Sequence, residues 1–279
     1  MIFNLRNTIG ARRGIITEDS FSFAGDYLFA SDDDGNFELA LLESGTLEWL
    51  VFPGEVDICL VGAGQDGQTA FFSGAQTMDY NDSFINSGKG GDGGRILTAT
   101  NVSLDDDCTI VVGTSGADSS LSCNGSTYTS ANGPVPKQGG RGAEIRQATN
   151  SAGNVNQGGA DGVWPFEADT DEQMIPELQG HRVGASGGGG HANNNYMGPW
   201  VPLEPAYVYT DEHGGNNAAG QTDAGAGADR SHHAGYDASG HGNGGGGGYG
   251  NGASHSDLGV GGAGSDGIIL IRNHKEATA

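Results

Sequence analysis

The sequence offers one glycine–aspartate motif that could bind a metal. Residues 261–269, GGAGSDGII, fit the calcium-binding nonapeptide G-G-x-G-x-D-x-U-x, with Asp266 at the carboxylate position. A calcium β-roll needs tandem copies, because each turn supplies half of a site, and this chain has one good match. The other interpretation is that the glycines end here and a β-strand, IILIR, begins. We favour the strand and read Asp266 as a turn residue.

Histidines and cysteines are the other candidate metal ligands. Five histidines fall between residues 213 and 255, namely His213, His232, His233, His241 and His255. Zinc sites use close, fixed spacings such as H-x-x-x-H on a regular element, and none occurs here. The cysteines, Cys59, Cys108 and Cys123, form no C-x-x-C pair, and their odd number argues against a disulfide framework. We predict no metal and no cofactor.

Enzyme motifs are weak. A polysaccharide depolymerase would need two carboxylates held across the scissile bond, and the pattern marks none of the 35 acidic residues as buried or paired. The segment VGAGQDG at 61–67 matches a dinucleotide-binding fingerprint loosely and has no helix pattern after it. We predict a protein that is not an enzyme, with a depolymerase as the least favoured alternative.

Aromatic side chains in two long segments, 161–180 and 191–213, are the candidate binding residues. They offer flat apolar faces with polar handles, which suit sugar rings or protein hot spots. The candidates are Trp164, Phe166, Tyr196, Trp200, Tyr207 and Tyr209. The alternative for each is that it packs its segment onto the rest of the fold.

Composition limits the class of protein. The chain has 279 residues, 53 of them glycine, and a formal net charge of −23. Alternating apolar segments, three tryptophans and eight tyrosines favour a folded chain over a disordered glycine-rich tract. The negative field excludes nucleic acid as a partner. No apolar run is long enough for a membrane span, and the first 20 residues lack the apolar stretch of a signal peptide.

The elements that would position these residues are β-strands. Alternating or continuous apolar segments separated by turn residues occur at 21–29, 36–42, 46–52, 55–62, 95–104 and 108–113. Short turns between them favour antiparallel pairing. At 55–62, Val56, Ile58 and Leu60 would face one side of the sheet, with Asp57 and Cys59 on the other.

Glycine clusters dominate the rest of the chain, at 88–94, 139–142, 184–190, 240–252 and 259–267. In an extended helix with about three residues per turn, peptide groups point outward and make no internal hydrogen bonds. Without Cβ atoms, neighbouring runs can approach closely enough to bond to one another. The clusters therefore predict a lattice of polyglycine-II-type helices joined by long loops. A flexible linker is the alternative for any single run.

The motifs FSFAGDY, DDGNF, SGTLEW, VDICLVGAGQDG, TIVVG and the closing GSDGIILIR resemble those of glycine-rich tail proteins of bacteriophages and prophages. The glycine-rich part is similar to the tail-fibre tip adhesins of T-even-like phages, whose distal domain is a sandwich of polyglycine-II helices carrying recognition loops. The resemblance implies receptor recognition on the bacterial surface. It also implies that 267–272 returns to pair with the early strands.

These observations give one hypothesis for the organisation of the chain. Residues 1–18 form an attachment segment for tail, fibre or baseplate proteins, 19–115 form an antiparallel β-sandwich unit closed by 266–274, and 116–265 form the receptor-binding region. The receptor would be a surface polysaccharide or an outer-surface protein. The protein would be a homotrimer, or a monomer on a trimeric fibre, in the virion tail. The alternative is a structural tail or decoration component without receptor binding.

Overall fold

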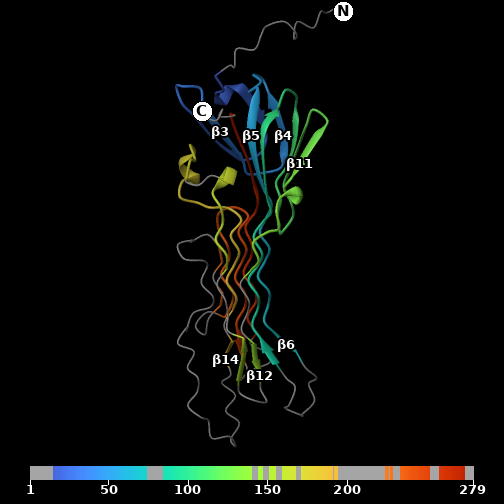
Figure 1. Cartoon of the computed structure of the whole chain (residues 1–279), viewed down its shortest axis with the longest axis vertical. Coiled ribbons are helices and arrows are strands. Elements are labelled where there is room, and N and C mark those ends of the chain that lie inside the picture. Colours follow the sequence, from blue (N-terminus) through green and yellow to red (C-terminus); the bar gives the residue numbers. More distant parts are fainter. Residues whose placement is uncertain are drawn as a thin grey trace, which may run out of the picture.

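The computed structural model describes most of the chain and is elongated. Its described residues are 15–73, 84–139, 144–146, 151–154, 159–167, 171–190, 192–193, 224–225, 227–228, 233–251 and 258–273. Figure 1 shows a β-sandwich at one end, a bundle of extended runs in the middle and short strands at the other end. No helix among these residues is long or apolar enough to span a membrane. Most of the expected attachment segment, residues 1–14, lies outside the described residues.

Two five-stranded antiparallel sheets form the sandwich, as the strand patterns predicted. The first has the order β1-β4-β9-β10-β11, with bounds Phe21–Phe23, Gly45–Trp49, Cys108–Val111, Ser120–Cys123 and Ser126–Thr129. The second has the order β2-β3-β16-β5-β8, with bounds Tyr27–Ser31, Phe37–Leu41, Ile268–Asn273, Glu55–Val61 and Ile96–Ser103. Two 3-10 turns, η1 (Glu18–Ser20) and η2 (Ser130–Asn132), flank the first sheet.

The core between the sheets follows the alternation read from β5. Val56, Ile58 and Leu60 are buried in this core, whereas Cys59 belongs to a second apolar cluster on the outer face of the second sheet. Phe21 and Trp49 meet edge to face within the same core, with ring centroids 5.8 Å apart. The burial of Val56, Ile58 and Leu60 on one face of β5 and of Cys59 on the other confirms the predicted faces of this strand.

The closing strand β16 lies in the centre of the second sheet. Ile269 pairs with Leu41 of β3 on one side and with Leu60 of β5 on the other. The prediction that the last strand returns to the early strands is confirmed. Asp266, just before this strand, is exposed, and its carbonyl accepts a hydrogen bond from Gly242 at 2.7 Å. The strand interpretation is thus confirmed, whereas the backbone at Asp266 belongs to the end of a lattice run and forms no turn.

Two boundaries differ from the expected ones. The segment 21–29 contains two strands, because the chain crosses from the first sheet to the second between β1 and β2. The first sheet also extends past residue 115, since the hairpin β10–β11 pairs with β9. Its turn is Asn124-Gly125, and both residues have positive φ, 54° and 74°. That is the type I′ hairpin geometry that Asn-Gly favours, so the signal was present in the sequence.

A hydrogen-bonded lattice of glycine-rich runs continues from the sandwich (Figure 1). Within the described part of the chain, the run 242–250 lies at the centre of this lattice and bonds to six other runs. Its N–H groups donate in rotation to three neighbours, and the pattern repeats every three residues. The donor–acceptor pairs are Gly244–Ala185, Gly245–Gln65, Gly246–Tyr236, Gly247–Gly188, Gly248–Gln68 and Tyr249–His233, at 2.9 to 3.0 Å.

The carbonyl groups of the same run accept hydrogen bonds from the remaining three neighbours. The donors are Gly88, Gly91 and Gly94, then Gly225 and Ala228, then Gly259, Gly262 and Ser265. Three residues per turn without internal bonds is the geometry of polyglycine II. The middle of the molecule is thus the predicted lattice, and its central helix has six neighbours.

Absence of Cβ atoms is a steric requirement of this packing. A Cβ built on Gly245 would lie 2.1 Å from the carbonyl oxygen of Gly262, and one on Gly247 would lie 2.0 Å from that of Gly88. Real Cβ contacts stay beyond 3.0 Å. Glycine at these positions is therefore set by close approach of two backbones.

Short strands end the lattice away from the sandwich (Figure 1). One small antiparallel sheet has the order β13-β12-β7-β6, with bounds Ser151–Asn154, Glu144–Arg146, Phe84–Asn86 and Phe71–Ser73. A parallel pair joins β14 (Ala192–Asn193) to β15 (Gly250–Asn251). Strands therefore flank both ends of two lattice runs, 62–70 between β5 and β6 and 88–95 between β7 and β8.

Candidate functional site

The segment 161–180 was expected to contact a receptor, and its described residues, 161–167 and 171–180, pack onto the sandwich. It contains η3 (Pro165–Glu167) and η4 (Pro176–Leu178), drawn in yellow beside the sandwich in Figure 1. Ile175 and Leu178 are 1% and 6% exposed and join an apolar cluster with Cys59 and Leu270 on the outer face of the second sheet. Strands β3, β5 and β16 carry apolar side chains on both faces, so this outer face needs a cover.

Phe166 contributes to this cover. It packs against the outer apolar cluster, and the guanidinium of Arg272 lies 4.0 Å from the centre of its ring. Nε of Arg272 lies 3.9 Å from Oδ2 of Asp57, and its Nη1 lies 3.7 Å from Oε2 of Glu172. The contacts give Phe166 the packing role that was the alternative to receptor binding.

A buried carboxylate anchors the same segment. The backbone N–H of Met174 donates to Oε2 of Glu38 at 2.6 Å. Burial raises the pKa of Glu38, and the Met174 N–H and the Arg272 charge oppose this rise. Glu38 and Asp57 are both buried beneath the segment. They are therefore structural groups, poorly placed to serve as the two carboxylates of a glycosidase.

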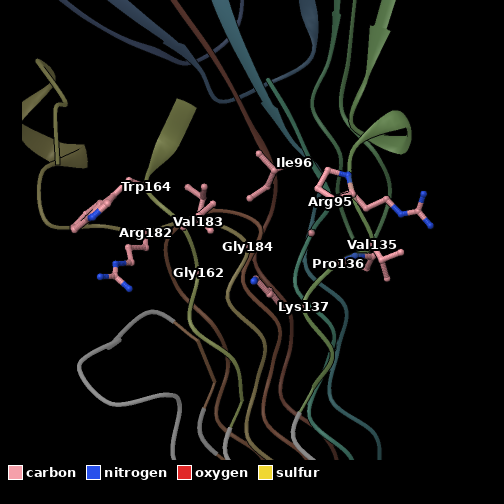
Figure 2. A pocket seen from close by; sticks show the side chains of 13 residues that line it. Arg95, Ile96, Val135, Pro136, Lys137, Gly162, Trp164, Arg182, Val183 and Gly184 are labelled. Carbon is pink, nitrogen blue, oxygen red and sulfur yellow. The ribbon is translucent and has the colours of Figure 1, made fainter. Parts of the chain in front are cut away.

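Trp164 lies at the junction of the sandwich and the lattice and borders a pocket of about 530 Å³. The guanidinium carbon of Arg182 lies over the Trp164 ring, 4.9 Å from its centre. Nη1 of Arg182 lies 3.9 Å from Oδ2 of Asp161. The pocket is lined by residues 94–96, 134–137, 162–164 and 182–184. Figure 2 shows Trp164 and Arg182 on one side, Val135 and Pro136 on the other, and Lys137 between them.

The other four aromatic candidates, Tyr196, Trp200, Tyr207 and Tyr209, lie outside the described residues. The chain enters their segment from β14, at the lattice end away from the sandwich (Figure 1). Trp164 and Phe166 lie at the sandwich end. The receptor-binding role of the other four therefore stays a prediction.

Acidic side chains hold the edges of the lattice, a role that the sequence patterns did not reveal. Oδ1 of Asp237 accepts the N–H of Ala263 at 2.7 Å, and Oδ1 of Asp66 accepts that of Gly264 at 2.9 Å. Asp92 accepts the N–H of Gly139 at 2.8 Å. Aspartates set within glycine clusters, as in GQDG and GGDGG, are the signal for this role.

The histidine cluster does not form a metal centre among the described residues, which contain no group of three or more His, Cys, Asp or Glu side chains able to hold an ion. His233 stacks on Tyr249, with ring centroids 4.8 Å apart and an angle of 16° between the planes. His213, His232 and His255 lie outside the described residues.

A profile of the glycine-rich domain family matches residues 42–274. The chain belongs to this family. The match begins just before β4 and ends after β16, so the glycine-rich domain includes most of the sandwich as well as the lattice. Comparison with curated proteins gave no match, and comparison with solved structures gave none.

Proposed function

We propose that this glycine-rich domain protein is an adhesin at the tail tip or tail fibre of a bacteriophage or phage-tail-like particle, where it recognises a receptor on the bacterial surface. The observation that carries the proposal is the lattice with its six-neighbour central run. Loops on a rigid scaffold are where binding residues concentrate. A core made of backbone hydrogen bonds leaves the connecting segments free to vary in sequence.

Position along the molecule supports the same function. The chain leaves β14 at the end far from the sandwich, and 194–213 then supplies Tyr196, Trp200, Tyr207 and Tyr209. Tyrosine and tryptophan provide large contact areas that retain a polar handle. Separation from the sandwich would let one end attach to a particle while the other meets the cell.

Adsorption inhibition tests the proposal. Purified full-length chain is added to host cells before the particle, and free particles are counted after adsorption. We expect the wild-type chain to inhibit adsorption and the Trp200→Ala/Tyr207→Ala double variant to inhibit much less. Tyr236→Ala is the matched control, because Tyr236 is an exposed aromatic residue of the lattice.

The other functions predict different results. A purely structural tail component would neither bind host cells nor inhibit adsorption, and antibody labelling would place it on the body of the particle. A depolymerase would release fragments from the envelope polysaccharide. Either result would refute the adhesin function. Inhibition by the double variant at the wild-type level would refute the assignment of the loop residues.

A further inference from the structure

The pocket beside Trp164 has properties that the adhesin function does not use. It lies at the junction of the sandwich and the lattice, away from β14 (Figures 1 and 2). Its volume of about 530 Å³ is within the range of small-ligand pockets. Four stretches of the chain meet there, and each is held by the fold: Val163 bridges Val183, and the N–H of Gly93 donates to the carbonyl of Lys137 at 2.9 Å.

The charge at this pocket is opposite to that of the chain. The protein has 12 Lys and Arg against 35 acidic residues, yet three of the 12 cations, Arg95, Lys137 and Arg182, line this pocket. Among the residues that the structure describes, no aspartate or glutamate lines it. A cleft lined by charges of one sign focuses the field and attracts ions of opposite charge, so this pocket favours anions although the rest of the surface repels them.

The three cations differ in what already neutralises or orients them. Arg95 donates to the carbonyl of Ala131 at 2.8 Å, and its guanidinium points away from the other lining residues (Figure 2). Arg182 lies over Trp164 and 3.9 Å from Asp161. Lys137 has no ion pair among the described residues, and its side chain is directed between the two walls (Figure 2). Lys137 is thus the cation available to a ligand.

The walls favour a ligand with an apolar face. Ile96, Val135, Pro136 and Val183 supply aliphatic surface, and Trp164 supplies a partly exposed ring. Sugar rings present apolar C–H faces between their hydroxyl groups, and an acidic sugar adds a carboxylate. We infer that this pocket binds an acidic saccharide, with its carboxylate on Lys137 and a ring face against Trp164 and the aliphatic wall. This inference does not depend on the adhesin function.

Titration calorimetry and ligand-observed NMR test the inference on the full-length chain, with trigalacturonate as the probe and maltotriose as its neutral counterpart. We expect trigalacturonate to bind, maltotriose to bind at least about tenfold more weakly, and salt to weaken the acidic ligand selectively. Lys137→Gln should lower the affinity for trigalacturonate by about tenfold, because one hydrogen bond to a charged group contributes about that factor. Trp164→Ala should lower the affinity for both trigalacturonate and maltotriose, because each would place a ring face against Trp164.

Lys89→Gln is the matched control, because Lys89 pairs with Asp92 outside the pocket and its loss changes the net charge equally. Lys89→Gln should bind trigalacturonate like the wild type. Three results would overturn the inference: no binding of trigalacturonate to the wild type, equal affinity for the neutral sugar, or equal losses in the two lysine variants. A wild-type chain that binds trigalacturonate but does not inhibit adsorption would refute the adhesin function alone.

Discussion

Replacing Gly245 by alanine tests the lattice directly. The new Cβ would lie 2.1 Å from the carbonyl oxygen of Gly262, so the two runs must separate by about 1 Å to reach an allowed contact. The central run accepts three backbone hydrogen bonds from this neighbour, donated by Gly262, Gly259 and Ser265 at 2.8, 2.9 and 2.8 Å. Two more join the same runs near the sandwich, from Gly242 to the Asp266 carbonyl and from Asn243 to Oγ of Ser265. At separations of about 3.8 Å the first three are no longer hydrogen bonds.

The stability loss follows from those three bonds. Each is worth about 1 to 2 kcal/mol when the groups are buried, which gives about 3 to 6 kcal/mol in total. For a chain of this size, such a loss lowers Tm by on the order of 10 °C or more. Scanning calorimetry of the wild type and Gly245→Ala measures it.

Gly125→Ala is the control for the glycine-to-alanine change itself. A Cβ at Gly125 meets no atom within 4 Å, and φ is +74°, so the variant carries only the strain of a left-handed residue, about 1 to 2 kcal/mol. We expect a Tm decrease of a few degrees for this control. If Gly245→Ala melted no lower than Gly125→Ala, the runs would not be packed as close as the lattice requires.

Two further predictions concern buried ionisable groups. Burial raises the pKa of Glu38 above its usual 4.5, so the folded state holds this proton more tightly than the unfolded state. The contribution of Glu38 to the free energy of unfolding therefore falls as pH rises from about 4.5 through the raised pKa, and is constant above it. Glu38→Gln should remove this fall, as urea denaturation at several pH values would measure, and an unchanged pH profile would contradict it. Burial also raises the pKa of the Cys108 thiol, so iodoacetamide at about pH 8 should modify it in urea but not in the native protein. Rapid native alkylation, detected by peptide mass spectrometry, would contradict that burial.

The sequence predicted the elements whose signals are local. Alternation in 55–62 predicted that Val56 and Ile58 lie in the core, and the glycine clusters predicted the lattice. Asn124-Gly125 carried a clear hairpin signal, which the expected domain boundary at 115 passed over. Each of these signals depends on a few neighbouring residues, so each can be read from the sequence alone.

Other features depend on which distant segments meet. The continuous apolar run IILI of β16 indicates a strand buried on both faces, but nothing local shows that Ile175 and Leu178 cover the outer face. The same limit applies to the pocket, since Trp164, Lys137 and Arg182 come together only through the fold. Their separation in the sequence carries no periodic signal.

The second sheet sets the order of the first lattice runs. In the sheet, β5 lies between β16 and β8. Beyond the strands, the run 62–70 that follows β5 keeps the same two neighbours: Gly62, Gln65 and Gln68 donate to the run before β8, at Arg95, Asp92 and Lys89. Gly64, Gly67 and Ala70 donate to the run before β16, at Ser265, Gly262 and Gly259.

The segments that pair as β-strands therefore keep the same neighbours where they continue into the lattice. Only the spacing of the hydrogen bonds along the chain changes, from every two residues in the strands to every three in the lattice runs. The central run 242–250 then bonds to all three of these runs. Because β16 comes after all the other described strands in the sequence, the sheet that aligns the runs is complete only when residues 268–273 are in place. Ordering each glycine costs about 1 to 2 kcal/mol of backbone entropy, and in the lattice only hydrogen bonds to neighbouring runs offset this cost. We therefore expect the lattice to form after β16 pairs with β3 and β5.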